Sequence, residues 1–408
     1  MKKTLFFMLF SFASLAGFAQ TDRAWSASSA KNVKTAKTVA RASFPKDYTL
    51  FELNDATIRQ ALQSAPGRDF SKKQKGVTIS LPNVQGQLEH FEVLEASNFE
   101  PALQAQYPGI RSYVGKSVED PSAILRMSVD TKGINTMVIR NGKPAEFMEQ
   151  YSEDGKIYAV FNSSREKAGL PFTCYTEDVA LANSVNVQGR NTNRSSAGEL
   201  LTFRLAMSVN GEYTQFHGGT VALALAAINT SINRVNGVFE RDLSIHLSII
   251  AASTTVIYTD AATDPYSTNL NSWNSQLQNT LTANIGEANY DVGHMFGASG
   301  GGGNAGCIGC VCQPGKGSGI TSPADGIPAG DNFDIDYVAH ELGHQFGANH
   351  TFSDNVEGTG VNVEPGSGST IMGYAGITNY DLQAHSDDYF VYASIKQIQD
   401  NMVAKTCP

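Results

Sequence analysis

Short runs of alternating apolar and polar residues fill residues 45–179. A period of two is typical of half-buried β-strands, and Gly, Asn-Gly or Asp-Gly pairs separate the runs. The predicted strands include "GVTISLP", "HFEVLEA", "SAILRMSVD", "INTMVIR" and "KIYAVF". Asn141 and Gly142 predict a hairpin turn in "INTMVIRNGKPAEFME", whereas "DATIRQALQ" has a helical period. We therefore expect a mostly β domain over 45–179.

From residue 199 onward the pattern becomes mixed, and longer helical runs alternate with strand-like runs. The predicted strands are "LLTFRLAMSV", "LSIHLSII" and "DVGHMFGA". The predicted helices are "GGTVALALAAINTSINRVNGVF", "LNSWNSQLQNTLTANI", "DNFDIDYVAHELGHQFG" and "YFVYASIKQIQDNMV". Gly347 stands where a glycine typically ends the third of these helices. We expect residues 199–408 to form an α+β domain.

The first 19 residues have a pattern of their own. Two lysines precede an apolar run from Leu5 to Phe18, with small residues at Gly17 and Ala19. The run is shorter than the roughly 20 apolar residues that a membrane span needs. This pattern is typical of a secretory signal peptide cut after Ala19. We therefore expect a secreted, extracellular protein that is not inserted into a membrane.

Two further stretches have neither a strand-like nor a helical period. Residues 20–44 are polar, small and basic, which predicts a flexible lead-in. Residues 180–198 are rich in Asn, Ser and Gly and lack aromatic residues, which is typical of an exposed linker. Arg190 and Arg194 are natural sites for proteolytic processing of this linker. An ordinary interdomain loop is the alternative, and composition does not decide between them.

Composition narrows the class of partner. The chain has 408 residues, a net charge of −9 and a pI near 5.4, which argue for two or three units and against nucleic acid as a partner. We expect a monomer.

An exported chain can form disulfides, and an odd number of cysteines leaves at least one without a cysteine partner. The five cysteines are Cys174, Cys307, Cys310, Cys312 and Cys407.

The densest group of metal-binding residue types lies in "DYVAHELGHQFGANHTF". His340 and His344 are four residues apart, so a helix places both imidazoles on one face. Glu341 would then reach a water on the metal rather than the metal itself. Gly347 can turn the chain so that His350 returns as a third ligand. Three protein ligands leave one position open, as a catalytic zinc site requires, and Glu341 would act as general base.

The spacing HExxHxxGxxH resembles the metzincin signature, and "GSGSTIMGYAG" resembles the methionine turn beneath the zinc of metzincins. Met372 in that turn would be a hydrophobic floor for the imidazoles and not a ligand. The reprolysin-like (adamalysin, ADAM-type) family fits best, especially its secreted bacterial branch. The resemblance implies a twisted mixed sheet, a long active-site helix and a small C-terminal subdomain, preceded by a β-rich propeptide.

The same resemblance implies a disulfide pattern. In the family, a cysteine after the edge strand is linked to the C-terminal segment, which matches Cys312 and Cys407. Cys307 and Cys310 would then pair locally. A metal cluster built from the Cys-x2-Cys-x-Cys spacing is the alternative, and the exported character of the chain argues against it.

Cys174 is left over in "LPFTCYTED". A thiolate is a good zinc ligand, and reprolysins use a propeptide cysteine as a switch that keeps the zinc site silent. The resemblance therefore implies that Cys174 is a cysteine switch, although the residues around it do not closely copy the family motif. A buried free thiol is the alternative.

Some positions depart from the family pattern. ADAM-type enzymes usually have Asp after the third histidine, where this chain has Thr351. Tyr374 resembles a tyrosine that stabilises the oxyanion in astacins and serralysins, and a rim or core role is the alternative. The family's calcium site is matched at Asp291, but Arg204 stands where a glutamate is expected. We therefore assign Zn²⁺ and leave structural Ca²⁺ unassigned.

The pattern and the resemblance together predict a secreted zinc metalloendopeptidase made as a zymogen, acting on protein or peptide substrates. An extended substrate would lie antiparallel to an edge strand near 303–309. One alternative is a catalytically silent metzincin-fold binding or adhesion module, whose mark would be loss of Glu341 or of a ligand. The other is a zinc hydrolase of a non-peptide substrate, against which the methionine turn and the edge strand count.

Overall fold

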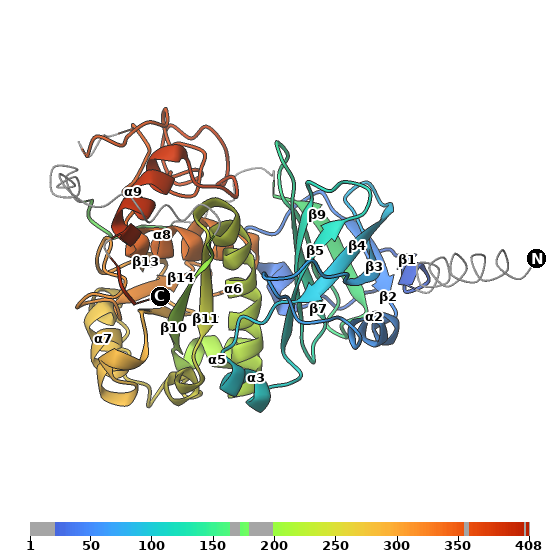
Figure 1. Ribbon diagram of the computed structural model, residues 1–408, viewed down its shortest axis with the longest axis horizontal. Helices are drawn as coiled ribbons and strands as arrows, with labels where there is room; N and C mark the ends of the chain where they lie inside the picture. The colour runs from blue at the N-terminus through green and yellow to red at the C-terminus, as the bar shows by residue number, and fades with distance from the viewer. Residues whose placement is uncertain (1–20, 164–171, 179–198, 355–358, 404, 408) are drawn as a thin grey trace, which may run out of the picture. The chain divides into compact units, whose positions relative to one another are not determined.

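The computed structural model describes residues 21–163, 172–178, 199–354, 359–403 and 405–407. These residues divide into two compact units (Figure 1). The first is drawn from Met1–Ala40, Pro45–Ser97 and Arg111–Ser163, and the second from Arg41–Phe44, Asn98–Ile110 and Ser164–Pro408. The expected signal peptide (1–19) and linker (180–198) lie outside the described residues.

The first unit is a nine-stranded antiparallel sheet with the order β1-β2-β9-β8-β7-β6-β5-β4-β3. Its strands are β1 (Trp25–Ala27), β2 (Thr49–Leu53), β3 (Val77–Pro82), β4 (Leu88–Glu95), β5 (Arg111–Ser117), β6 (Ile124–Val129), β7 (Ile134–Ile139), β8 (Glu146–Gln150) and β9 (Ile157–Asn162). The helix α2 (Asp55–Leu62) buries Ile58 and Leu62 in the same core. Strands β7 and β8 pair across the predicted turn, where Gly142 has φ 67°.

The stretch expected to be a flexible lead-in contributes β1 and the short helix η1 (Lys37–Ala40). The physical reason is the burial of Trp25 in a mostly polar stretch. Trp25 is 8% exposed within the core of the first unit, and its indole N–H donates to the carbonyl of Ser80 at 2.7 Å. Burial of this large ring with its polar atom satisfied, together with the pairing of β1 with β2, orders the short strand.

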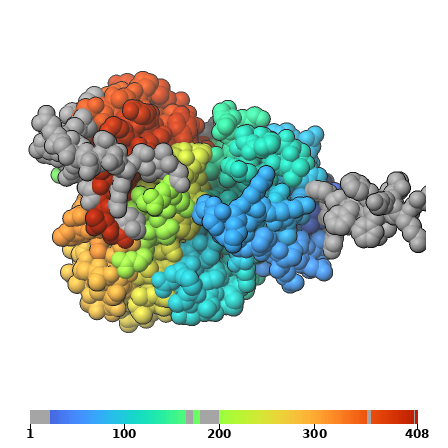
Figure 2. Space-filling view, viewed as in Figure 1, coloured from blue at the N-terminus to red at the C-terminus, as the bar shows by residue number. Residues whose placement is uncertain are grey.

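The second unit contains a five-stranded mixed sheet with the order β11-β10-β12-β14-β13. Four strands are parallel, and β13 is antiparallel to β14 at the edge. The strands are β10 (Leu201–Val209), β11 (Ile245–Ile249), β12 (Val292–Phe296), β13 (Gly302–Asn304) and β14 (Gly319–Ser322). The helices are α3 (Pro101–Gln106), α5 (Gly211–His217), α6 (Val221–Leu243), α7 (Trp273–Asn284), α8 (His340–Phe346) and α9 (Tyr392–Val403), with the short helices η2 (Ala251–Val256), η3 (Leu270–Ser272) and η4 (Glu287–Asn289). In the space-filling view the part of the chain coloured orange-red forms the top of this unit's surface, and the dark red C-terminal residues lie below it (Figure 2).

The helix expected over "DNFDIDYVAHELGHQFG" has two halves. Residues Asn332–Ala339 (η5) form wider π-helical turns, and His340–Phe346 form the regular helix α8. In the π-helical half the buried Asp334 carboxylate accepts from the Arg234 guanidinium of α6 at 2.8 Å. Tertiary contacts of this kind override local propensity, and periodicity alone does not reveal them.

Two segments from the N-terminal part of the chain belong to the second unit. The amide of Ile249 in β11 donates to the carbonyl of Asn98 at 2.7 Å, and the amide of Glu100 donates to the carbonyl of Ile249 at 2.9 Å. The guanidinium of Arg41 lies 3.6 Å from the Asp331 carboxylate, and both side chains are buried. The compact second unit therefore includes residues upstream of the sequence boundary at 199.

The structure contains the two disulfides Cys307–Cys310 and Cys312–Cys407. These are the pairings that the family resemblance implies. Among the described residues, no helix combines the length and the apolar character that a membrane crossing requires.

Candidate metal centre

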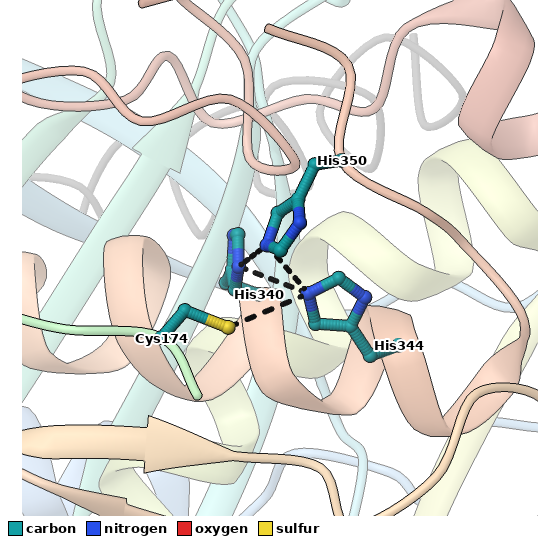
Figure 3. Close-up of side chains that lie close together, drawn as sticks. All are labelled: Cys174, His340, His344 and His350. Carbon is teal, nitrogen blue, oxygen red and sulfur yellow. Dashed lines mark hydrogen bonds between the residues drawn. The ribbon is translucent and has the colours of Figure 1, made fainter. Parts of the chain in front are cut away.

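The helix α8 and the turn after it bring three imidazoles together. His340 and His344 lie on one face of α8, which ends at Gly347 with φ 123°. A left-handed backbone of this kind favours glycine, and it returns the chain so that His350 joins the other two rings. The Nε2 atoms lie 3.1 Å apart for His340 and His344, 3.3 Å for His340 and His350, and 3.0 Å for His344 and His350 (Figure 3).

Backbone carbonyls orient two of these rings. The Nδ1 atom of His340 contacts the carbonyl oxygen of Ile371 at 2.6 Å, and that of His344 contacts the carbonyl oxygen of Ala348 at 2.7 Å. A carbonyl only accepts, so Nδ1 must carry the proton and Nε2 the lone pair. Lone pairs that face one another at the centre need a cation between them, and neutral imidazole nitrogens are common zinc ligands. The residues present therefore fit a zinc ion.

Burial keeps two of the rings in the neutral form that binds metals. Burial lowers the pKa of His340 to about 3, and the neighbouring His350 lowers it further. Burial also holds the pKa of His344 well below its usual value, with His350 and His340 acting in the same direction. Protons therefore do not compete with a metal at these two nitrogens near neutral pH.

Met372 lies against the helix α8. Its side chain is fully buried, and a Cβ atom on Gly343 of α8 would lie 2.6 Å from the sulfur. The glycine therefore allows the methionine to approach the helix closely. The amide of Thr351 donates to the carbonyl of Met372 at 3.0 Å, which connects the methionine turn to the residue after His350.

Glu341 lies between the histidines and the edge strand. Its side chain is fully buried, and a Cβ atom on Gly303 of β13 would lie 2.1 Å from its Oε1. Burial raises the pKa of Glu341 to about 7, although hydrogen bonds from Cys174 and Thr176 act in the opposite direction. A buried carboxyl with a pKa near neutrality suits a group that takes up and returns a proton.

Residues 172–178 pass directly over the histidine cluster. The Cys174 sulfur lies 3.7 Å from Nε2 of His344 (Figure 3), and one ligand atom from each of four residues lies within 4.8 Å of the others. Those residues are Cys174, His340, His344 and His350. Burial raises the pKa of the Cys174 thiol, and the Glu341 carboxylate raises it further. A cation at the cluster would favour the thiolate instead.

The same segment forms strand-like contacts with the edge strand. It runs parallel to β13, with Cys174 opposite Gly303. The amide of Tyr175 donates to the carbonyl of Gly303 at 2.8 Å, and the amide of Gly303 donates to the carbonyl of Thr173 at 3.0 Å. The observed edge strand, Gly302–Asn304, is shorter than the predicted 303–309 region.

Two residues of this segment contact the centre without having been predicted from the sequence. The hydroxyl of Thr176 donates to Oε2 of Glu341 at 3.0 Å and accepts from the amide of Ala305 at 2.8 Å. The Asp178 carboxylate accepts from the amide of His350 at 3.0 Å and lies 3.1 Å from its Nδ1. The only signal in the sequence is their position two and four residues after Cys174.

Two further residues singled out in the sequence, Tyr374 and Asp291, have defined contacts. The Tyr374 ring stacks on Phe352 at 4.2 Å between centroids and lies 4.6 Å from the His350 ring. The buried Asp291 carboxylate accepts from the Arg204 guanidinium at 2.7 Å. A cationic side chain therefore holds the carboxylate that matches the family's calcium site.

Comparison with known families identifies the class of protein. Residues 200–404 match the metallopeptidase family M12B, reprolysin-like. The match covers 205 residues (404 − 200 + 1), just over half of the 408. No curated protein matches the chain. The chain therefore belongs to the reprolysin-like M12B metallopeptidases, and this membership implies a zinc metallopeptidase with protein or peptide substrates.

Proposed function

We propose that the protein is a secreted zinc metalloendopeptidase made as a zymogen. In this proposal His340, His344 and His350 hold the zinc and Glu341 is the general base. The observation that carries the proposal is the convergence of three imidazole Nε2 atoms within 3.0–3.3 Å of one another, beside a buried carboxylate.

The chain's own residues define the chemistry. Bound zinc supplies Lewis acidity to a peptide carbonyl and to water. Glu341 removes the proton of the attacking water and passes it to the leaving amine, for which its raised pKa of about 7 is suited. Tyr374, whose ring lies beside that of His350, is a candidate donor to the oxyanion.

The edge of the mixed sheet is the proposed substrate-binding strand. Strand β13 pairs with β14 on one side, and on its other side Gly303 pairs with Thr173 and Tyr175. Once that segment leaves, these outer backbone groups can pair with an added chain. An extended substrate would lie antiparallel to β13 and gain main-chain hydrogen bonds without regard to sequence. The bond to be cut would then pass between Glu341 and the histidines.

Residues 172–178 are the proposed inhibitory segment. The Cys174 thiol would take the fourth position at the zinc, and Thr176 holds the carboxylate of the general base. The segment runs parallel to β13, opposite to the proposed direction of a substrate, so it fills the site without presenting a bond for cleavage. Cutting the linker over 180–198 would allow it to leave.

The test uses full-length protein with a specific protease site placed in 180–198. Casein hydrolysis is measured before and after the cut, with Glu341→Gln and a chelated sample beside it. We expect activity after the cut that requires both zinc and Glu341. If the cut, zinc-loaded protein cleaved nothing across a broad peptide library, the peptidase reading would fail. The binding module or the non-peptide hydrolase would then replace it.

A further inference from the structure

The position after the third histidine lacks the usual acidic residue, yet a buried carboxylate lies beside it. Thr351 follows His350, and its hydroxyl donates to Oε2 of Glu364. We propose that Glu364 is a positioning residue for the zinc site, holding the supports of two of the three ligand histidines in place. The inference rests on the proposed zinc-binding role of the histidines.

Glu364 binds two separate stretches of chain. Its Oε1 accepts from the amides of Ser369 and Thr370, both at 3.0 Å. Its Oε2 accepts from the Thr370 hydroxyl at 2.7 Å and from the Thr351 hydroxyl. The residue is 7% exposed, so water does not readily replace these donors. Hydrogen bonds to a charged acceptor are stronger than neutral ones, and more so away from water.

Backbone contacts make the same connection. The amide of Glu364 donates to the carbonyl of Thr351 at 2.9 Å, and the amide of Thr351 donates to the carbonyl of Met372 at 3.0 Å. Phe352 and Glu364 form a parallel bridge. Three parts of the chain therefore lie side by side, and the Glu364 carboxylate crosses between them.

The contacts lead to two ligands and not to the third. Thr351 is covalently next to His350. Thr370 is covalently next to Ile371, whose carbonyl accepts from Nδ1 of His340 at 2.6 Å. His344 has a separate support, since its Nδ1 contacts the carbonyl of Ala348 at 2.7 Å. Glu364 therefore acts on the two histidines whose placement depends on the methionine turn and on the loop after α8.

A carboxylate at this place can come from either of two positions. Because the Thr351 hydroxyl already touches the Glu364 carboxylate, Thr351→Asp would bring a second carboxylate against the first. Two like charges in one buried site destabilise each other. In the double variant, Thr351→Asp with Glu364→Ala, the site would again hold a single carboxylate. The two changes are therefore expected to damage the centre separately and to compensate together.

The experiment measures zinc affinity of full-length protein by competition with a chromophoric chelator. Outer partners of metal ligands typically contribute about 10–100-fold in metal affinity, and we expect a loss in this range for Glu364→Gln and Glu364→Ala. Thr351→Asp alone should also weaken binding, whereas Thr351→Asp with Glu364→Ala should bind more tightly than Glu364→Ala. The exposed Glu199→Gln is the matched charge control and should match the wild type.

Two further readouts separate positioning from general stabilisation. Visible absorption of the Co²⁺-loaded protein reports ligand geometry, and it should change in Glu364→Gln and be restored in the double variant. Unfolding temperatures are compared with and without metal. Unchanged zinc affinity and cobalt spectrum, with an equal loss of unfolding temperature in both states, would overturn the inference. So would a double variant that binds no better than Glu364→Ala.

Zinc binding does not require turnover, so the outcomes of the two proposals can be told apart. A wild-type protein that binds zinc tightly and cleaves no peptide would refute the peptidase proposal and leave the role of Glu364 testable by affinity. A folded wild-type protein that binds no zinc would refute both. Thr351→Val, which removes one of the four donors, provides a milder variant if Glu364→Ala does not fold.

Discussion

The proposed metal-binding side and the proposed blocking side of the centre are built in different ways. The three histidines lie between residues 340 and 350, and the carbonyls of Ala348 and Ile371 orient two of them. By contrast, Cys174 and Thr176 reach the centre from 170 and 165 residues earlier in the sequence.

This difference separates two properties of the molecule. Ligands that a helix and its following turn hold in place do not depend on distant parts of the chain. Blocking groups on a distant segment keep their place only while that segment stays docked. We therefore expect metal binding to survive removal of the segment and latency to be lost. His350 belongs to the three histidines but also depends on the distant segment, because Asp178 of that segment contacts its ring.

The largest expected effect comes from the metal-binding side. Glu341→Gln keeps the three histidines and removes the proposed general base. General acid–base catalysis contributes about 10²–10⁴-fold, so kcat/KM for a peptide substrate should fall in this range in the cut protein. Zinc content, measured by atomic absorption, should stay the same. A fall that was matched by loss of zinc would show that Glu341 serves the metal site instead.

The second largest expected effect is a rise in the activity of the uncut protein when the proposed blocking segment is changed. Cys174→Ala in uncut, full-length protein removes the thiol that faces His344. Loss of a charge-assisted contact of about 1.5–3 kcal/mol corresponds to roughly 10–100-fold, and activity of the uncut protein should rise by that factor. The rise is measured against a fluorogenic peptide. Equal activity of wild type and variant before the cut would show that Cys174 does not inhibit the uncut protein.

A smaller rise in activity is expected from a second residue of the same segment. Thr176→Val removes the hydroxyl that holds Glu341 and keeps the shape of the side chain. One hydrogen bond of about 1 kcal/mol corresponds to roughly fivefold, so activity of the uncut protein should rise by about that much. Thr173→Val is the matched control, because the exposed Thr173 contacts β13 through its backbone carbonyl. An equal rise in both variants would indicate general loosening of the segment.

Much of the metal centre could be predicted because its parts are close in sequence. The spacing of His340 and His344 follows from helix geometry, and Gly347 marks the turn that returns His350. The same reasoning could not find the π-helical turns before α8, whose Asp334 carboxylate is fixed by Arg234 of another helix.

The contacts that were not predicted are made by short polar side chains, whose partners lie far away in the sequence. Thr176 and Asp178 carry no periodic signal, and their roles appear only once residues 172–178 lie over the histidines. The sequence gives no function to Glu364, because the donors that define its role come together only in the folded loop. Strand β1 was missed for a similar reason, since one buried Trp25 orders a polar stretch.

The central claim is that Cys174 takes the fourth position of a three-histidine zinc site. Its most direct test is near-ultraviolet absorption of Co²⁺-loaded, full-length protein, because a thiolate bound to cobalt gives a sulfur-to-metal charge-transfer band. The account predicts this band in the uncut protein, its absence in Cys174→Ala, and its loss when the linker is cut and residues 172–178 leave. Tight cobalt binding with no such band in uncut wild-type protein would contradict the claim.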